Sequence, residues 1–278
     1  MKKLLACWIL LLSSALPAAG QGITSSTIDG DTIRLGVALP GGLGADVSLT
    51  FEDADGLNLS SLGISAQVAN PLDPALLSRL LGAQLTSGFP VLLRIEPPAN
   101  GGLVFRGVVT LEIHTHNLVY LPATPLRLFS APLGGTFRDV TTYMGSGSYR
   151  VRGRSGGFSE FLILLDLRPV NQVITYKLNY LEQVLDNWAS SMPAPLYADL
   201  SARLDTIRAD FARGATTAAI QGVDGFLAEV EQHAGTDIPN EWRATRDVYN
   251  LAGYLRAGAE TLRFSLVLKK ISLGFLGL

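Results

Sequence analysis

The strongest constraint on the fold is a change in hydrophobic period at Pro169. Before Pro169, apolar residues alternate with polar ones, which is typical of strands with one buried face. After Pro169, apolar residues recur every three or four positions, which is typical of amphipathic helices. The sequence therefore predicts an α+β chain with strands in its first part and helices in its second.

The segment Ser148–Pro169 contains the end of the strand pattern. Tyr149 and Val151 alternate with three arginines, a Ser-Gly-Gly turn follows, and apolar alternation resumes from Phe161 to Leu167. This pattern predicts a β-hairpin with one buried face. Although Gly153-Arg-Ser-Gly-Gly157 has the spelling of a nucleophile elbow, that device needs a helix after its serine, so we interpret it as a turn.

The residues before this segment predict further strands. They are expected near residues 31–39, 47–51, 64–68, 91–95, 103–116, 126–129 and 136–143. In the longest of them, Phe105, Val109, Leu111 and Ile113 would face inward. About eight strands at this spacing predict an antiparallel β-sandwich over residues 22–169.

Residues 170–263 predict a bundle of three to four helices, because each apolar stripe needs partners to cover it. The stripes include Ile174 to Trp188, Leu200 to Phe211, Ile220 to Val230 and Trp242 to Leu262. Residues 264–278 are interpreted as an apolar tail, too short and too interrupted by lysines to span a bilayer. The tail could pack on the bundle, pair as a strand or lie in a membrane surface.

Residues 1–20 have the features of a secretory signal peptide. Two lysines precede an apolar run from Leu4 to Leu12, and Ala18-Ala19-Gly20 forms a small-residue cleavage site. We therefore expect a secreted or periplasmic protein without a transmembrane segment in the mature chain. Cys7 is the only cysteine, so the mature chain would form no disulfide and no thiolate site.

The charge balance gives no sign of nucleic-acid binding. The chain holds 22 basic and 24 acidic residues, and removing Lys2 and Lys3 leaves 20 against 24, a net charge of −4. Proteins that bind nucleic acids usually carry a basic surface. We therefore expect a protein or polysaccharide partner and no cofactor.

Two resemblances add to this interpretation. Leu204-Asp-Thr-Ile-Arg-Ala-Asp-Phe-Ala-Arg-Gly214, with Ala219 to Val230 and Ala-Gly235-Thr-Asp-Ile238, resembles the FIMAH module, a small helical domain of extracellular bacterial proteins. Gly-Thr-Phe137-Arg-Asp-Val140 and Gly147-Ser-Tyr-Arg-Val151 look like the closing strands of Ig-like domains in bacterial envelope proteins. The resemblance to Ig-like domains implies binding or display rather than catalysis.

Glu112, His114 and His116 form the first candidate site. They lie at alternate positions of one predicted strand, so their side chains share a face and could hold zinc or a similar divalent ion. The alternative is a solvated strand face, because two histidines and one carboxylate lack a fourth protein ligand.

Arg150, Arg152 and Arg154 form the second candidate site. They line one face of their strand and could bind carboxylates, phosphates or acidic glycans. The alternative is a solvated arginine face, in part neutralised by cross-strand pairing to Glu160 or Asp166.

These patterns together favour an exported, non-catalytic bacterial interaction or structural module. The competing hypothesis is a metal-dependent hydrolase that uses Glu112, His114 and His116.

Overall fold

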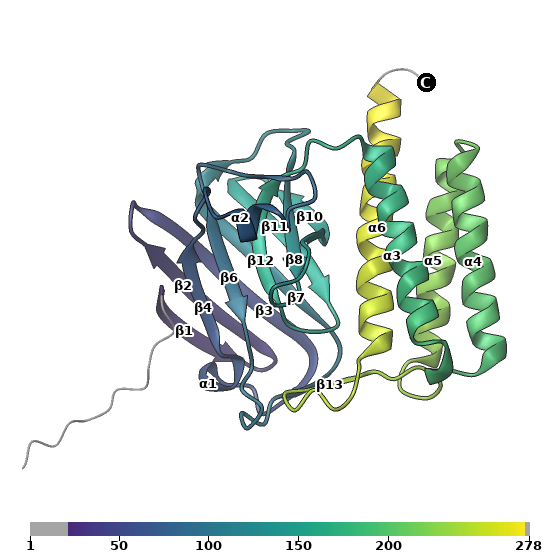
Figure 1. Ribbon diagram of the computed structural model, residues 1–278, viewed down its shortest axis with the longest axis horizontal. Helices are drawn as coiled ribbons and strands as arrows, with labels where there is room; N and C mark the ends of the chain where they lie inside the picture. Colours follow the sequence, from purple (N-terminus) through teal and green to yellow (C-terminus); the bar gives the residue numbers. More distant parts are fainter. Residues whose placement is uncertain (1–21, 276–278) are drawn as a thin grey trace, which may run out of the picture.

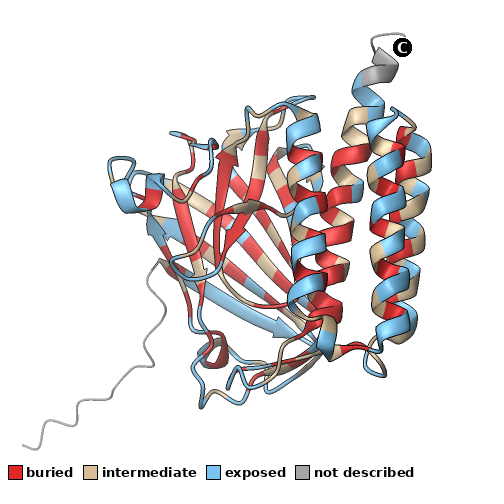
Figure 2. Ribbon diagram, turned by 45° about the vertical axis from the view of Figure 1, so that its right-hand side comes forward, coloured by how far each residue is buried: buried red, intermediate tan, exposed pale blue. Residues whose placement is uncertain are grey.

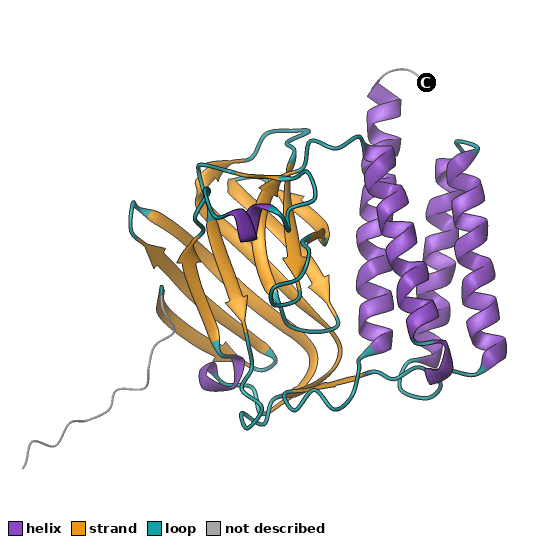
Figure 3. Ribbon diagram, viewed as in Figure 1, coloured by secondary structure: helices purple, strands orange, loops and turns teal. Residues whose placement is uncertain are grey.

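The computed structural model describes residues 22–275. The predicted signal peptide, residues 1–20, and the last residues of the predicted tail lie outside this range. Strands fill the N-terminal part and helices the C-terminal part, as the change of period predicted, and Figure 3 shows this separation. The two parts lie side by side in Figure 1, with the sheets at one side and the long helices at the other.

The larger of two antiparallel sheets has seven strands. Its order is β1-β2-β3-β7-β11-β10, and β13 also pairs with β7. The bounds are β1 (Ile23–Asp29), β2 (Thr32–Leu39), β3 (Leu43–Asp55), β7 (Val104–Val119), β10 (Thr141–Gly145), β11 (Ser148–Ser155) and β13 (Glu241–Arg243). Strands β3 and β7 are therefore central, and they carry the candidate site.

The smaller sheet has six strands in the order β4-β6-β12-β8-β9, with β5 paired to β12. The bounds are β4 (Ile64–Val68), β5 (Gln84–Leu85), β6 (Val91–Ile95), β8 (Leu126–Ala131), β9 (Arg138–Asp139) and β12 (Glu160–Leu165). Two short helices, α1 (Leu59–Leu62) and α2 (Pro74–Leu77), lie between strands of this region. Together the sheets exceed the seven or nine strands of immunoglobulin domains, and an Ig-like arrangement is not confirmed.

The predicted hairpin between residues 148 and 167 is wrong. Strand β11 belongs to the larger sheet and β12 to the smaller one, so the intervening turn carries the chain from one sheet to the other. The composition of β12 explains this, because residues 161–164 are apolar and buried in succession, as expected of an interior strand covered on both faces. Phe161 and Ile163 belong to the core shared with the larger sheet. Leu162 and Leu164 lie on the opposite face and pack under the segment that contains α2.

The inward faces of the two sheets form one apolar core, and Figure 2 shows buried residues recurring along the strands. Phe105, Val109, Leu111 and Ile113 lie in it, as the period-two pattern of β7 predicted. Tyr149 is also fully buried, and its hydroxyl donates a hydrogen bond to the carbonyl of Leu126 at 2.7 Å. The polar tip of this large side chain is therefore satisfied inside the core.

The four long helices form a second core. They are α3 (Val170–Asn187), α4 (Ala194–Ala212), α5 (Thr216–His233) and α6 (Leu251–Phe275), with a 3₁₀ turn at Ala189–Ser191. Their buried stripes meet in one apolar cluster that is separate from the cluster between the sheets. Residues 264–275, predicted as a tail, instead continue α6. Among the described residues, no helix combines the length and the apolar character needed to cross a membrane.

Trp242 was expected on the fourth helix, and this expectation is wrong. It lies in β13, whose pairing with β7 places Trp242 opposite Phe105. The indole stacks on the ring of Phe105, with centroids 5.4 Å apart, and meets the ring of Phe158 edge-on at 4.8 Å. A segment from the helical half of the sequence thus completes the core between the sheets.

Helix α6 packs on the outer face of the larger sheet through close backbone contacts. Asn250, which is fully buried just before α6, donates to the carbonyls of Gly107 and Gly156 at 2.7 and 3.1 Å. A Cβ at Gly156 would lie 2.5 Å from the backbone nitrogen of Tyr254, and one at Gly253 would lie 2.6 Å from the carbonyl oxygen of Gly107. Only glycine permits this approach at both positions.

Lys177 on α3 makes a deeply buried ion pair between the helices and the smaller sheet. Its ammonium donates to a carboxylate oxygen of Asp139 at 2.7 Å, and both side chains are less than a twentieth exposed. The same group donates to the hydroxyls of Thr261 and Ser265 on α6 at 2.6 and 2.9 Å. This buried cation is therefore paired and hydrogen-bonded.

Candidate functional site on the outer face of the larger sheet

The candidate residues lie on three neighbouring strands of the larger sheet. Strand β7 runs between β3 and β11, and their outward residues align in rows across the sheet. One row contains Asp46, His114 and Arg150, and the next contains Ser48, Glu112 and Arg152. Since alternate residues of a strand share a face, these rows form a polar surface opposite the apolar core.

The three arginines are close together, but each is paired with a carboxylate of the chain. The Arg150 guanidinium donates to one oxygen of Glu112 at 2.8 Å, and Arg152 donates to the other oxygen. Arg154 donates to Glu260 on α6 at 2.5 Å. The sequence predicted cross-strand neutralisation, but the residues that it named for this role, Glu160 and Asp166, lie elsewhere.

Glu160 and Asp166 pair with other arginines. Arg94 donates to Glu160 at 2.7 Å and Arg79 donates to its other oxygen, while Arg168 donates to Asp166 at 2.7 Å. The carboxylates that neutralise the arginine row come instead from β7 and α6. Neither pairing is readable from the sequence, because both depend on which elements lie beside β11.

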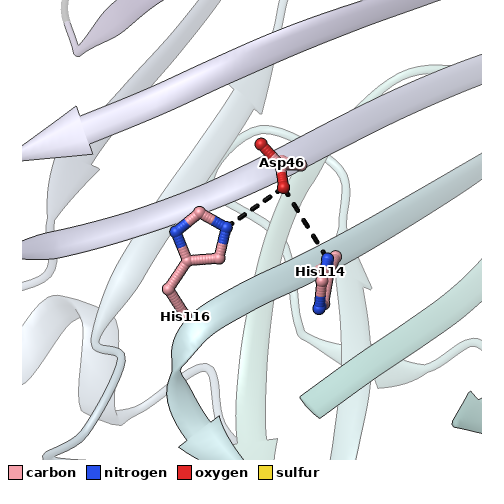
Figure 4. A group of neighbouring side chains, drawn as sticks. All are labelled: Asp46, His114 and His116. Carbon is pink, nitrogen blue, oxygen red and sulfur yellow. Dashed lines mark hydrogen bonds and ion pairs between the residues drawn. The ribbon is translucent and has the colours of Figure 1, made fainter. Parts of the chain in front are cut away.

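The structure brings the two histidines together but does not join Glu112 to them. Instead, an oxygen of Asp46 lies 3.0 Å from Nε2 of His116 and 3.7 Å from Nδ1 of His114 (Figure 4). Glu112 is held by Arg150 and Arg152 in the adjacent row. The predicted metal set is therefore rearranged, and Asp46 is the residue that the sequence interpretation missed.

A broad polar groove lies between this sheet face and α6. Its volume is about 810 Å³, and its charged lining residues are Arg34, Arg152, Arg154, Arg263, Glu112 and Glu260. The remaining lining is mostly hydroxyl groups of threonines and a serine, with Phe264 and Val267 on the helix side. A hollow of about 350 Å³ adjoins the groove and shares Arg34, Ser48 and Glu112 with it; its lining also includes Asp46, His114 and Arg150, so the arginine row extends from the groove into this hollow.

Glu260 is a largely buried carboxylate on the α6 side of the groove. Burial raises the pKa of Glu260, and the nearby guanidinium of Arg154 only partly offsets the loss of hydration. The ion pair that anchors Arg154 is therefore formed by a carboxylate in a poorly hydrated position.

A family match covers both the sheets and the helices. The match is to a family of unknown function, DUF6689, and extends over residues 8–270. The chain belongs to the DUF6689 family. No curated protein matches the chain at a significant level.

The match to DUF6689 corrects both resemblances. No FIMAH-like module is found in the helical part, and the family extends unbroken through the region assigned to an Ig-like envelope domain. The FIMAH pattern consisted of leucines, alanines and glycines at helical spacing, which many packed helices satisfy. The strand pattern was equally general, because alternation predicts a buried face without specifying strand order.

Proposed function

We propose that this DUF6689 protein is an exported, non-catalytic interaction protein that binds an acidic polysaccharide in the groove between the larger sheet and α6. The observation that carries this proposal is the charge of the groove. Its lining holds four arginines and two glutamates, although the whole chain carries a net charge of −2. A positive recess on a slightly negative molecule favours an anionic ligand.

The pairing of the arginines does not exhaust their donors. The hydrogen bonds within the described residues engage one guanidinium nitrogen in each of Arg150, Arg152 and Arg154. Since arginine has five N–H donors in a planar fork, each side chain retains donors for a carboxylate or sulfate. The glutamates also hold the guanidinium groups in position, which lowers the conformational entropy lost when a ligand binds.

The spacing of the groups suits a repeating ligand. Alternate residues along a strand lie about 6.5 to 7 Å apart, so the row on β11 presents cations at regular intervals. The threonine and serine hydroxyls of the lining can donate to and accept from sugar hydroxyls. The predicted signal peptide supports an exported location, where such polymers occur.

The competing hypothesis, a hydrolase with Glu112 as metal ligand, has less support. Both oxygens of Glu112 accept hydrogen bonds from arginines, and an ion would have to displace these bonds. Moreover, two positive guanidinium groups beside the carboxylate oppose the binding of a cation.

Binding to dextran sulfate and polygalacturonate at low and high salt tests the proposal. The triple variant Arg150→Gln, Arg152→Gln, Arg154→Gln should lose roughly tenfold in affinity at low salt, because three exposed contacts of about 0.5 kcal/mol each amount to about 1.5 kcal/mol, and about 1.4 kcal/mol corresponds to a factor of ten. The native protein should weaken as salt rises, because salt screens exposed charges.

The matched control replaces Arg203, Arg208 and Arg243 with glutamine. These arginines are also paired with carboxylates and partly exposed, but they lie outside the groove. The control should bind as the native protein does. Equal losses in the two triple variants would contradict the proposal, since they would indicate a general charge effect.

A further inference from the structure

Asp46, His114 and His116 converge at one point of the outer sheet face. Asp46 comes from β3 and the histidines from β7, and the pairing of these strands places Asp46 directly opposite His114. Their nearest ligand-type atoms all lie within 4.8 Å of one another. Figure 4 shows both imidazole rings directed toward the same carboxylate.

We propose that these three side chains form a binding site for zinc or a similar borderline divalent ion. Two imidazole nitrogens and a carboxylate oxygen are ligands that zinc prefers. With bonds of about 2.0 to 2.1 Å, the ligand atoms of a tetrahedral site lie roughly 3.3 Å apart. The separations of 3.0 and 3.7 Å from Asp46 to the two histidines lie on either side of this value.

The strands that carry the ligands are held firmly at this point. Beside His116, the side chain of Asn117 accepts from the backbone nitrogen of Gly44 at 2.8 Å and donates to the carbonyl of Gly42 at 3.0 Å. These bonds fix the loop before β3 to the end of β7. The site therefore rests on two central strands whose relative position is set independently of an ion.

Gly44 also leaves room for the imidazole of His116. A Cβ at Gly44 would lie 3.4 Å from Nδ1 of His116, at the limit of ordinary contact. A larger residue at this position would contact the ring, so glycine keeps this side of the imidazole open.

The site is open on its solvent side. The side chains of His114, His116 and Asp46 are 25%, 54% and 68% exposed. Three protein ligands leave a fourth position for water or for a group of a bound ligand, as in zinc sites that are open to solvent. Because the adjoining hollow joins the polar groove through Arg34, Ser48 and Glu112, an ion at this point would add a positive charge beside that groove.

The test is a titration of the protein, purified without a histidine tag and stripped with chelator, with Zn²⁺ in competition with a chromophoric chelator. We expect one equivalent to bind. We also expect Co²⁺ to give the visible absorption of a low-coordinate site. The single variants His114→Ala, His116→Ala and Asp46→Asn should each weaken Zn²⁺ binding by at least about tenfold.

Two controls separate this site from the alternatives. Glu112→Gln tests the set that the sequence alone suggested, and His233→Ala tests adventitious binding to the third histidine, which lies on α5 beside Asp237. Neither variant should weaken Zn²⁺ binding as much as the three single variants do, because neither removes a proposed ligand. Circular dichroism of each variant checks that the fold is retained.

Two results would overturn the proposal. One is a stoichiometry that stays the same in the His114→Ala, His116→Ala double variant. The other is a loss in Glu112→Gln equal to that in Asp46→Asn. The outcome is independent of the polysaccharide experiment, because the arginine variants retain all three metal ligands.

Discussion

The two faces of the larger sheet are packed in different ways. Its inner face meets the smaller sheet through apolar side chains that form one continuous cluster. Its outer face, and the neighbouring edge of the smaller sheet, meet α3 and α6 through buried polar side chains such as Asn250 and the Lys177–Asp139 pair. An apolar contact tolerates many sequences of suitable volume, whereas a buried hydrogen-bonded contact requires particular partners at particular positions.

This difference suggests why the outer face can hold a binding site. The apolar core stabilises the sheets without involving the outward side chains, which are then available for ligand binding. The polar contacts of α3 and α6 fix the helices at one side of the outer face. The groove is formed between α6 and this face. Substitutions on the two faces should therefore lower the free energy of unfolding by different amounts.

The largest effect is expected from removing the helices altogether. Residues 22–169 alone would lack Trp242, which belongs to the core between the sheets, and Lys177, the partner of buried Asp139. Although the sequence predicts a β-sandwich over residues 22–169, these contacts indicate that this segment does not fold without the helices. Residues 22–275 should show a cooperative thermal transition in circular dichroism, and residues 22–169 should not. A cooperative transition in the shorter chain would show that the polar junction is dispensable.

Within the apolar face, Phe105→Ala should be more damaging than any single substitution on the polar face. Phe105 is fully buried and contacts the rings of Phe51, Phe158 and Trp242. The free energy of unfolding should fall by about 3 to 5 kcal/mol, from lost burial and the remaining cavity. Urea unfolding measures it, with Val119→Ala as an exposed control on the same strand, where the change should stay within about 0.5 kcal/mol.

At the polar junction, Asp139→Asn should cost about 3 kcal/mol, because it leaves the ammonium of Lys177 buried without its counter-charge. Asp205→Asn, on the exposed surface of α4, is the matched control and should have little effect. The double variant Asp139→Leu, Lys177→Met should recover much of the loss, since it removes both charges. A double variant as unstable as Asp139→Asn would indicate that the hydrogen bonds matter more than the charges.

The smallest predicted effect is a loss of stability in acid. Burial alone would raise the pKa of Asp139, but Lys177 and a hydrogen bond from Thr141 outweigh it and hold the pKa below its usual value. Burial and the guanidinium groups of Arg79 and Arg94 have the same opposed effects on the pKa of Glu160, which is also lowered.

The sign of the pH dependence follows from these lowered pKa values. The contribution of each carboxyl is complete above its unfolded pKa of about 4 and is lost as the pH falls through the lower folded pKa. The urea midpoint should therefore decrease below about pH 4. The effect should be smaller than that of Asp139→Asn, because acid alone titrates the pair only partly. The Asp139→Asn variant should show a weaker acid dependence, and an unchanged one would exclude Asp139 as a source.

The positions of the candidate residues on their own strands could be predicted from local pattern, but the residues that lie beside them on other elements could not. Alternation correctly placed His114 and His116 on one face of β7 and the three arginines on one face of β11. It could not place Asp46 beside the histidines, because Asp46 lies 70 residues before His116 and a shift of one residue in strand pairing would turn it to the other face.

The sequence by itself determined the two structural periods, the change at Pro169 and the inward residues of β7. These are local properties, since the spacing of apolar residues within one element decides which face can be buried. Only the tertiary structure decided that β12 leaves β11 for the other sheet, that Trp242 enters the core as part of β13, and that Glu112 binds arginines instead of joining the histidines. Each of these features depends on which distant segment lies beside the residues concerned, and the combined packing of both sheets and the helices determines that arrangement.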